Sequence, residues 1–110
     1  MLSLRKPESE KIYQDKPKKE GCFLCDRDLL LKEYEHWILV ENKYPYDLIA
    51  SKHDLIATKR HIKGHDNLTI AEIAELNKIR NETNYDLEMF NKPIRQSHNT
   101  HFHIHFIKFI

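Results

Sequence analysis

Three histidines alternate with large apolar residues near the C-terminal end of the sequence. His101, His103 and His105 are separated by Phe102 and Ile104. Because side chains in a β-strand point alternately to its two faces, a strand here would place the three imidazoles in one row and bury the apolar residues in the core. Histidine forms strands less readily than Phe or Ile, so the row predicts a chemical role. The alternative is a histidine-rich exposed strand or an adventitious metal patch.

A second group of reactive side chains is the pair Cys22 and Cys25. A Cys-x-x-Cys pair supplies two thiolates from one tight turn, and tetrahedral zinc takes thiolate and imidazole ligands. Two further ligands would then have to come from elsewhere in the chain. Two alternatives stay open: a pair of small, half-buried residues, or a redox pair of the thioredoxin kind, although no βαβ unit follows the pair.

The length and the net charge limit the kinds of function that the chain can have. The chain of 110 residues is long enough for one domain with a single hydrophobic core. With 18 Lys and Arg against 17 Asp and Glu, the formal net charge is +1, so the sequence predicts neither a nucleic-acid nor a membrane partner. The N-terminal end is too poor in apolar residues for a signal peptide, and no apolar run approaches the ~18 residues of a membrane span. We therefore expect a cytoplasmic protein.

The chain divides into a lead-in and a compact domain. Residues 1–20 are rich in charge and contain two prolines, so we expect a mobile or loosely docked segment without chemistry. Residues 21–110 should form the domain. Apolar runs predict a buried strand at 37–40 and a second strand at 54–58. Residues 26–35 predict a short helix or turn, and the alternating histidines predict the last strand.

One long helix is predicted after Thr69. Thr69 and Glu72 form the Thr-x-x-Glu pattern of a capping box. The helix is expected to run to about Met89, because Lys92 and Pro93 stop it. Its inward side is predicted to carry five apolar residues: Ile70, Ile73, Ala74, Leu76 and Ile79.

The alternating histidines resemble the His-φ-His-φ-His-φ-φ signature of the histidine triad (HIT) family, in which φ is apolar. Here the signature reads His-Phe-His-Ile-His-Phe-Ile and begins at His101. Four other features follow in that family's order: Cys22 with Cys25, Asn-Lys-Tyr-Pro at 42–45, Lys-Arg-His at 59–61, and Leu-Thr at 68–69. The resemblance covers about residues 21–110.

The resemblance implies an α+β fold, an antiparallel sheet of about five strands with one long helix. Members commonly dimerise through that helix and an edge strand, so a homodimer is expected. The resemblance also implies that His61 and His101 join Cys22 and Cys25 as ligands of a closed, structural zinc site.

Catalytic roles follow from the resemblance and from imidazole chemistry. A neutral imidazole nitrogen can attack phosphorus when its other nitrogen donates to an acceptor that fixes the tautomer. The family works through a nucleotidyl-histidine intermediate, which implies His103 as the nucleophile at an α-phosphate. His105 and His53 are implied as donors to the phosphate, with an ordinary structural role as the alternative for His53. The expected protein is a nucleotide hydrolase or nucleotidyl transferase acting on a purine phosphoramidate or a dinucleoside polyphosphate.

Nucleotide contacts are implied at three further positions. Asn42 stands where the family places a polar residue against the ribose hydroxyls, although Asn before Lys-Tyr-Pro is also a good turn residue. Ser97 and Asn99 stand where the family usually has a glycine-rich loop that touches phosphate. This chain has no glycine between Gln96 and Thr100. A second hypothesis is therefore a catalytically weak nucleotide-binding or scaffold protein that keeps the structural zinc.

Overall fold

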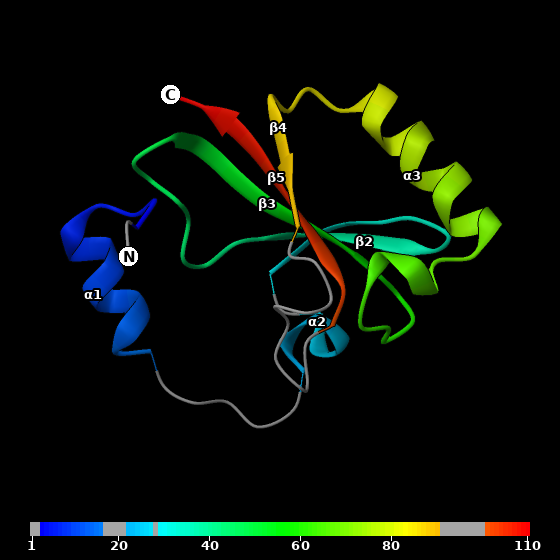
Figure 1. Ribbon diagram of the computed structural model, residues 1–110, viewed down its shortest axis with the longest axis horizontal. Coiled ribbons are helices and arrows are strands. Elements are labelled where there is room, and N and C mark those ends of the chain that lie inside the picture. Colours follow the sequence, from blue (N-terminus) through cyan, green and yellow to red (C-terminus); the bar gives the residue numbers. More distant parts are fainter. Residues whose placement is uncertain (1–2, 17–21, 28, 91–100) are drawn as a thin grey trace.

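A five-stranded sheet organises the chain. The structure, a computed structural model, describes residues 3–16, 22–27, 29–90 and 101–110. Within these residues the strands pair antiparallel in the order β1-β2-β3-β5-β4. The strands are β1 (Leu30–Glu33), β2 (Trp37–Glu41), β3 (Ala50–Thr58), β4 (Leu87–Met89) and β5 (His103–Phe109), and the α-helices are α1 (Pro7–Gln14), α2 (Phe23–Asp26) and α3 (Ile70–Glu82). The predicted α+β fold, with an antiparallel sheet and one long helix, is confirmed (Figure 1).

The helix α3 packs on one side of the sheet and closes the larger part of the core. Phe102, Ile104 and Phe106, which alternate with the histidines, are each 1 % exposed. Burying a large apolar side chain contributes about 1.5–3 kcal/mol, so these three residues determine which face the histidines take. The core on this side is built from nine buried side chains: Trp37, Leu39, Ile56, Ile62, Leu76, Ile79, Phe102, Ile104 and Phe106.

The opposite side of the sheet carries the histidines. In the antiparallel pairing of β3 with β5, His103 lies opposite Ala57 and His105 lies opposite Leu55. Directly opposite residues of such a pair project to the same face, and His53 shares that face because it precedes Leu55 by two residues. A smaller apolar cluster supports this side: Leu24, Ile38, Val40, Leu55 and Ala57.

The helix α3 is shorter than predicted. It ends at Glu82, and the hydroxyl of Thr83 donates to the Ile79 carbonyl at 2.9 Å. The chain then turns back, and β4 (Leu87–Met89) pairs with β5. The prediction of a helix to about residue 89 is therefore wrong. A strand of three residues is too short to show an alternating pattern in the sequence, and β4 forms by pairing with the outer edge of β5.

The buried side of α3 also differs from the prediction. Of the five apolar residues expected to face inward, Leu76 and Ile79 are buried. The exposed ones are Ile70, Ile73 and Ala74. Glu72 takes a buried position instead, because its carboxylate accepts hydrogen bonds from Arg60 at 2.6 and 3.0 Å. Charge-assisted hydrogen bonds of this kind offset the cost of burying a carboxylate.

Two strand boundaries also differ from the prediction. Residues 26–35 are expected to form a short helix or turn, whereas β1 lies within them and pairs with β2. All four residues of β1 are exposed, so no buried face marks this strand in the sequence. β3 begins at Ala50 rather than at Asp54, so the strand starts earlier in the sequence than predicted.

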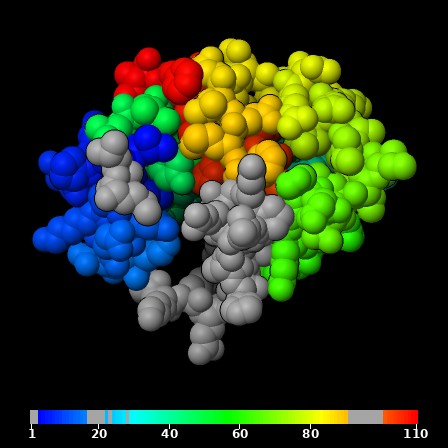
Figure 2. Space-filling view, viewed as in Figure 1, coloured from blue at the N-terminus to red at the C-terminus, as the bar shows by residue number. Residues whose placement is uncertain are grey.

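The described part of the N-terminal segment, residues 3–16, contains α1. The sequence predicts a mobile or loosely docked lead-in here, so a helix with specific contacts is more structure than expected. In the space-filling view this segment, in blue, and α3, in yellow-green, lie at opposite sides of the molecule (Figure 2). Among the described residues, no helix combines the length and the apolar character that crossing a membrane requires.

Candidate functional site

The four residues expected to bind metal meet at one point. Cys22 precedes α2 and Cys25 lies within it, whereas His61 follows β3 and His101 precedes β5. Their ligand atoms, one from each residue, all lie within 4.8 Å of one another. The fold thus brings together ligands from three parts of the sequence, and the four residues could hold a metal ion.

The imidazole of His101 is oriented toward the two cysteines. Its Nδ1 lies 3.4 Å from the Sγ of Cys22 and 3.4 Å from the Sγ of Cys25. Its Nε2–H donates to the carbonyl of Thr58 at 2.5 Å. The Nδ1 of His61 lies 3.3 Å from the Cys25 Sγ. Because a backbone acceptor fixes the tautomer of His101, the nitrogen that faces the cysteines keeps its lone pair for a metal.

A backbone carbonyl also fixes the tautomer of His103. The Nδ1–H of His103 donates to the carbonyl of His101 at 2.8 Å, so the neutral ring carries its lone pair on Nε2. Burial lowers the pKa of His103, and the bond to the carbonyl acts in the opposite direction. His103 is therefore a neutral imidazole near pH 7 with an unprotonated Nε2, the form that acts as a nucleophile.

His53 and His105 form a hydrogen-bonded pair. The backbone N–H of Tyr46 donates to the Nδ1 of His53 at 3.0 Å, so neutral His53 carries its proton on Nε2. That Nε2–H donates to the Nδ1 of His105 at 2.8 Å. His105 must then carry its own proton on Nε2, where it is a donor for an incoming group. One backbone N–H therefore determines the tautomers of both rings.

Both imidazoles of this pair are neutral near pH 7. Burial, the charge of Arg5 and the neighbouring His103 lower the pKa of His53 to about 4. Burial, His103, His53 and Arg5 lower the pKa of His105 to about 3. The ring of Tyr46 covers the pair, with its centroid 4.5 Å from that of His53 and 5.3 Å from that of His105, on which it stacks at 22°. Neutral rings of fixed tautomer suit hydrogen-bond donation to an anion.

The sequence matches no family model and no curated protein. Solved structures do match. A HIT family hydrolase from Clostridium thermocellum is 22% identical, with 84% of this chain and 94% of that chain covered and a TM-score of 0.59. A histidine triad protein from Clostridium difficile is 18% identical, with 83% and 92% covered and a TM-score of 0.55. A histidine triad nucleotide-binding protein from Candida albicans is 22% identical, with 80% of this chain and 76% of that chain covered and a TM-score of 0.52. The chain has the histidine triad fold.

Within this histidine triad fold the three alternating histidines divide between two neighbouring groups. His101 belongs to the cysteine cluster, whereas His105 is hydrogen-bonded to His53 and His103 lies beside His105. The ring centroids of His103 and His105 are 5.1 Å apart. The placement of His101 with the cysteines agrees with the cluster that the resemblance implies.

Asn42 contacts the backbone of its own turn and the ring of His53. Its Oδ1 accepts a hydrogen bond from the Tyr44 N–H at 2.8 Å, and its Nδ2 lies 3.2 Å from the Nε2 of His53. This is the geometry of an Asx-turn, the role that the sequence leaves open beside a ribose contact. The other two residues expected at the nucleotide, Ser97 and Asn99, lie outside the described residues.

Two residues near the histidine pair are missed by the sequence analysis. Tyr46 lies between the two strands predicted at 37–40 and 54–58, and Arg5 lies in the lead-in, yet the Arg5 guanidinium lies 4.7 Å from the centroid of the Tyr46 ring. No periodic pattern joins residues so far apart in the sequence. The sequence offers only the residue types as a signal for this contact, because arginine and tyrosine side chains form cation–π contacts.

We expect the histidine pair to make the protein less stable in acid. A histidine whose folded pKa lies below its unfolded value of about 6.5 contributes stability that is complete above that value and is lost as the pH falls toward the folded pKa. For His53 and His105 the folded values are about 4 and about 3. The free energy of unfolding in urea should therefore fall by a few kcal/mol between about pH 7 and about pH 5.

The control for this measurement is the double variant His53→Gln/His105→Gln, compared in the same buffers. The double variant keeps the cysteine cluster, so any acid release of a bound metal affects both proteins equally. Its unfolding free energy should depend less steeply on pH than that of the wild type. Equal slopes in the two proteins would show that the pair does not cause the loss.

Proposed function

We propose that this protein is a nucleotide hydrolase or nucleotidyl transferase that acts at an α-phosphate through a nucleotidyl-histidine intermediate. The observation that carries the proposal is the placement of His103, with its unprotonated Nε2, beside His105, with its protonated Nε2. Similar solved structures are named a HIT family hydrolase and a histidine triad nucleotide-binding protein. Those names support hydrolysis and nucleotide binding as the general function.

The proposed reaction consists of two displacements at the same phosphorus. The Nε2 of His103 attacks, a P–N bond forms, and the bond from phosphorus to the leaving group breaks with its electron pair going to the leaving group, which takes up a proton. Water, or an incoming phosphate in the transferase, then attacks the phosphorus. The P–N bond breaks, its electron pair returns to the imidazole, and the proton of the attacking water passes to solvent.

His105 has the proposed role of stabilising the negative charge that develops on the non-bridging oxygens. Its Nε2–H is set by the chain of hydrogen bonds from the Tyr46 N–H through His53. Because these bonds exist before substrate binds, the donor need not reorient as charge develops. A single preorganised donor of this kind is worth roughly 10²–10³-fold in kcat.

Zinc is the metal that we propose for the four-ligand cluster. With Zn–S of about 2.3 Å and Zn–N of about 2.0 Å, a tetrahedral site has S–N separations of about 3.5 Å. The Sγ of Cys25 lies 3.3 Å from the Nδ1 of His61 and 3.4 Å from the Nδ1 of His101, and the Sγ of Cys22 lies 3.4 Å from the Nδ1 of His101. These three separations fit the geometry. With four protein ligands the bound ion would be structural and would tie α2 to the ends of β3 and β5.

The proposed substrate is a small purine nucleotide, either a phosphoramidate or a dinucleoside polyphosphate. Asn42, Ser97 and Asn99 are its candidate contacts in the proposal. With a net charge of +1, we propose neither a nucleic acid nor a membrane as partner. We further propose a cytoplasmic homodimer that pairs through α3 and β4, because β4 lies at the edge of the sheet and an edge strand has unpaired backbone groups.

The test is direct. The protein is incubated with adenosine 5′-phosphoramidate and, separately, with diadenosine tetraphosphate, and AMP release is followed by chromatography. Intact mass spectrometry of a quenched reaction should show an adenylyl group on a fraction of the protein. AMP binding without AMP release or adduct would overturn the enzyme and favour the scaffold hypothesis.

A further inference from the structure

The N-terminal segment 3–16 contacts the loop between β2 and β3 beside the histidine pair. The Nε–H of Arg5 donates to the Tyr44 carbonyl at 3.0 Å. The guanidinium carbon lies 3.8 Å from the ring centroid of Tyr13 and 4.7 Å from that of Tyr46. The Arg5 side chain is 11% exposed. Arg5 is thus enclosed by one ring from α1 and one ring from the loop.

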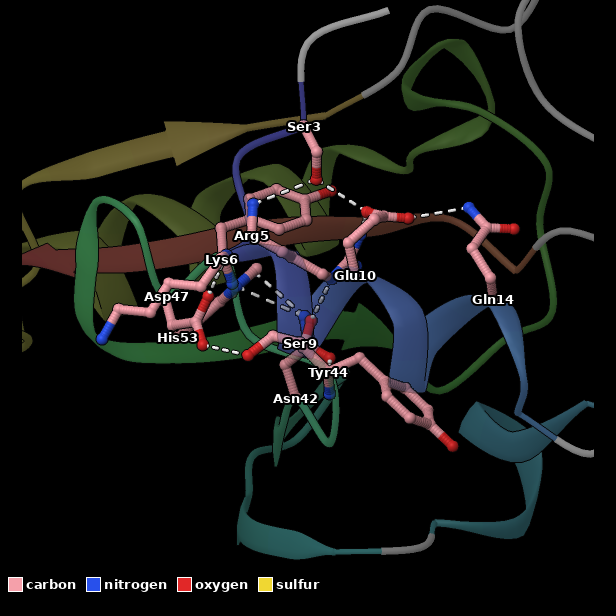
Figure 3. Close-up of polar contacts among 11 residues, drawn as sticks. Ser3, Arg5, Lys6, Ser9, Glu10, Gln14, Asn42, Tyr44, Asp47 and His53 are labelled. Atoms are coloured by element: carbon pink, nitrogen blue, oxygen red, sulfur yellow. Dashed lines mark hydrogen bonds and ion pairs between the residues drawn. The ribbon is translucent and has the colours of Figure 1, made fainter.

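A carboxylate from the same loop fixes the start of α1. Asp47 accepts hydrogen bonds from the backbone N–H of Lys6 at 2.7 Å and from the hydroxyl of Ser9 (Figure 3). A carboxylate at this position satisfies unpaired N–H groups and is favoured by the helix dipole. The Leu48 N–H also donates to the Leu4 carbonyl at 3.0 Å. The segment is therefore anchored to the loop at several points besides Arg5.

We propose that Arg5 is a positioning residue of the histidine site that acts by holding Tyr46 against His53 and His105, an inference that rests on the proposed function. Tyr46 contacts the pair through its backbone N–H, 3.0 Å from the Nδ1 of His53, and through its ring, stacked on His105. Arg5 holds this turn at the Tyr44 carbonyl and at the Tyr46 ring. Displacing the turn releases the tautomer of His53 and, with it, the donor on His105.

Arginine can make both contacts, and lysine cannot. The planar guanidinium lies on an aromatic ring with its face while its edge N–H groups donate to a carbonyl, whereas an ammonium group is a compact point charge. The ion pair between Arg5 and Glu10 at 3.4 Å, together with the hydrogen bond from Ser3 to Glu10 at 2.6 Å, further fixes the guanidinium. The contact therefore depends on the shape of the Arg5 side chain as well as on its charge.

The charge of Arg5 also affects the histidine pair. The charged and titratable groups around the pair and Tyr46 are Arg5, which precedes α1, Glu10 and Tyr13 from α1, Tyr46 itself from the loop and His103 from β5. Arg5 lowers the pKa of both His53 and His105, in addition to the larger effect of burial. Charge and position can be separated by comparing methionine with lysine at residue 5.

The experiment compares Arg5→Met and Arg5→Lys with the wild-type protein by NMR of the imidazole nitrogens. These spectra report the tautomer and the pKa of His53 and His105 without any turnover. In Arg5→Met we expect His53 to become a mixture of tautomers, the pKa of both rings to rise, and kcat to fall about tenfold with KM changed less than twofold. In Arg5→Lys the pKa should recover, whereas the mixed tautomers and the lower kcat should persist.

Two further variants separate positioning from general damage. Asp47→Ala releases the start of α1 and should reproduce the mixed tautomer of His53. Lys32→Met removes a cation–π contact of 4.9 Å with the ring of Tyr34 outside the histidine site and should leave spectra and kcat unchanged. Full recovery of tautomer and kcat in Arg5→Lys, or a wild-type spectrum in Arg5→Met, would overturn the inference. A wild-type protein without turnover would overturn the proposed function, and the spectra would still decide the role of Arg5.

Discussion

Replacing His103 by alanine should lower kcat for AMP release by on the order of 10³-fold or more and should abolish the adenylyl adduct. The reason is that the nitrogen atoms of the neighbouring imidazoles are protonated, accept hydrogen bonds or face the cysteines. His105 carries its proton on Nε2, His53 donates its Nε2–H to His105, and His101 turns its Nδ1 toward the cysteines. Of these four rings, His103 is the one whose tautomer leaves a nitrogen lone pair outside the metal cluster and outside the hydrogen bonds among the described residues.

The matched control is His65→Ala. His65 is exposed and its ring packs 5.4 Å from that of Phe90, so the variant removes a histidine without touching the proposed site and should keep wild-type kcat. His103→Asn should still bind AMP with an affinity within a few-fold of the wild type, because it removes the nucleophile and keeps the shape of the site. An adduct that persists in His103→Ala would place the nucleophile on another residue.

The histidine strand is the part of the fold that the sequence predicts best. Its period of two is a local property, and burying Phe102, Ile104 and Phe106 on one face leaves the histidines a single place on the other. The pairing of this strand with its neighbours is predicted less well. The pairing that sets His53 beside His105 depends on the register between β3 and β5, which the resemblance implies but the residues of either strand alone do not determine.

The rest of the site could not be predicted because its contacts join distant segments. Arg5, which precedes α1, contacts the ring of Tyr46, and Asp47 holds the start of α1. Each of these residues by itself is ordinary in a charged lead-in or a loop. Glu72 shows the same limitation in α3. Its carboxylate is buried because Arg60 comes to it from outside the helix, which no hydrophobic period within the helix can report.

Substituting both Cys22 and Cys25 by serine should remove the metal and lower the free energy of unfolding by several kcal/mol. The helix α2 has four residues, too few to be stable alone. Leu24 joins it to the smaller apolar cluster, so the ion would supply much of what holds α2 against the sheet. Native mass spectrometry should show one zinc per wild-type chain and none in the double variant. Urea unfolding with and without chelator measures the loss.

The loss of metal should also reduce turnover, because His101 belongs to the cysteine cluster and also contacts His103. Its ring faces the cysteines while its carbonyl accepts the Nδ1–H of His103 at 2.8 Å. Chelation would free the His101 ring and loosen the carbonyl that sets the tautomer of the proposed nucleophile, so kcat should fall about tenfold at a temperature where the protein remains folded. A Cys25→His variant, which keeps four ligands, should retain metal and most of the activity. Equal stability and equal kcat with and without chelator would show that the cluster neither stabilises the fold nor supports the nucleophile.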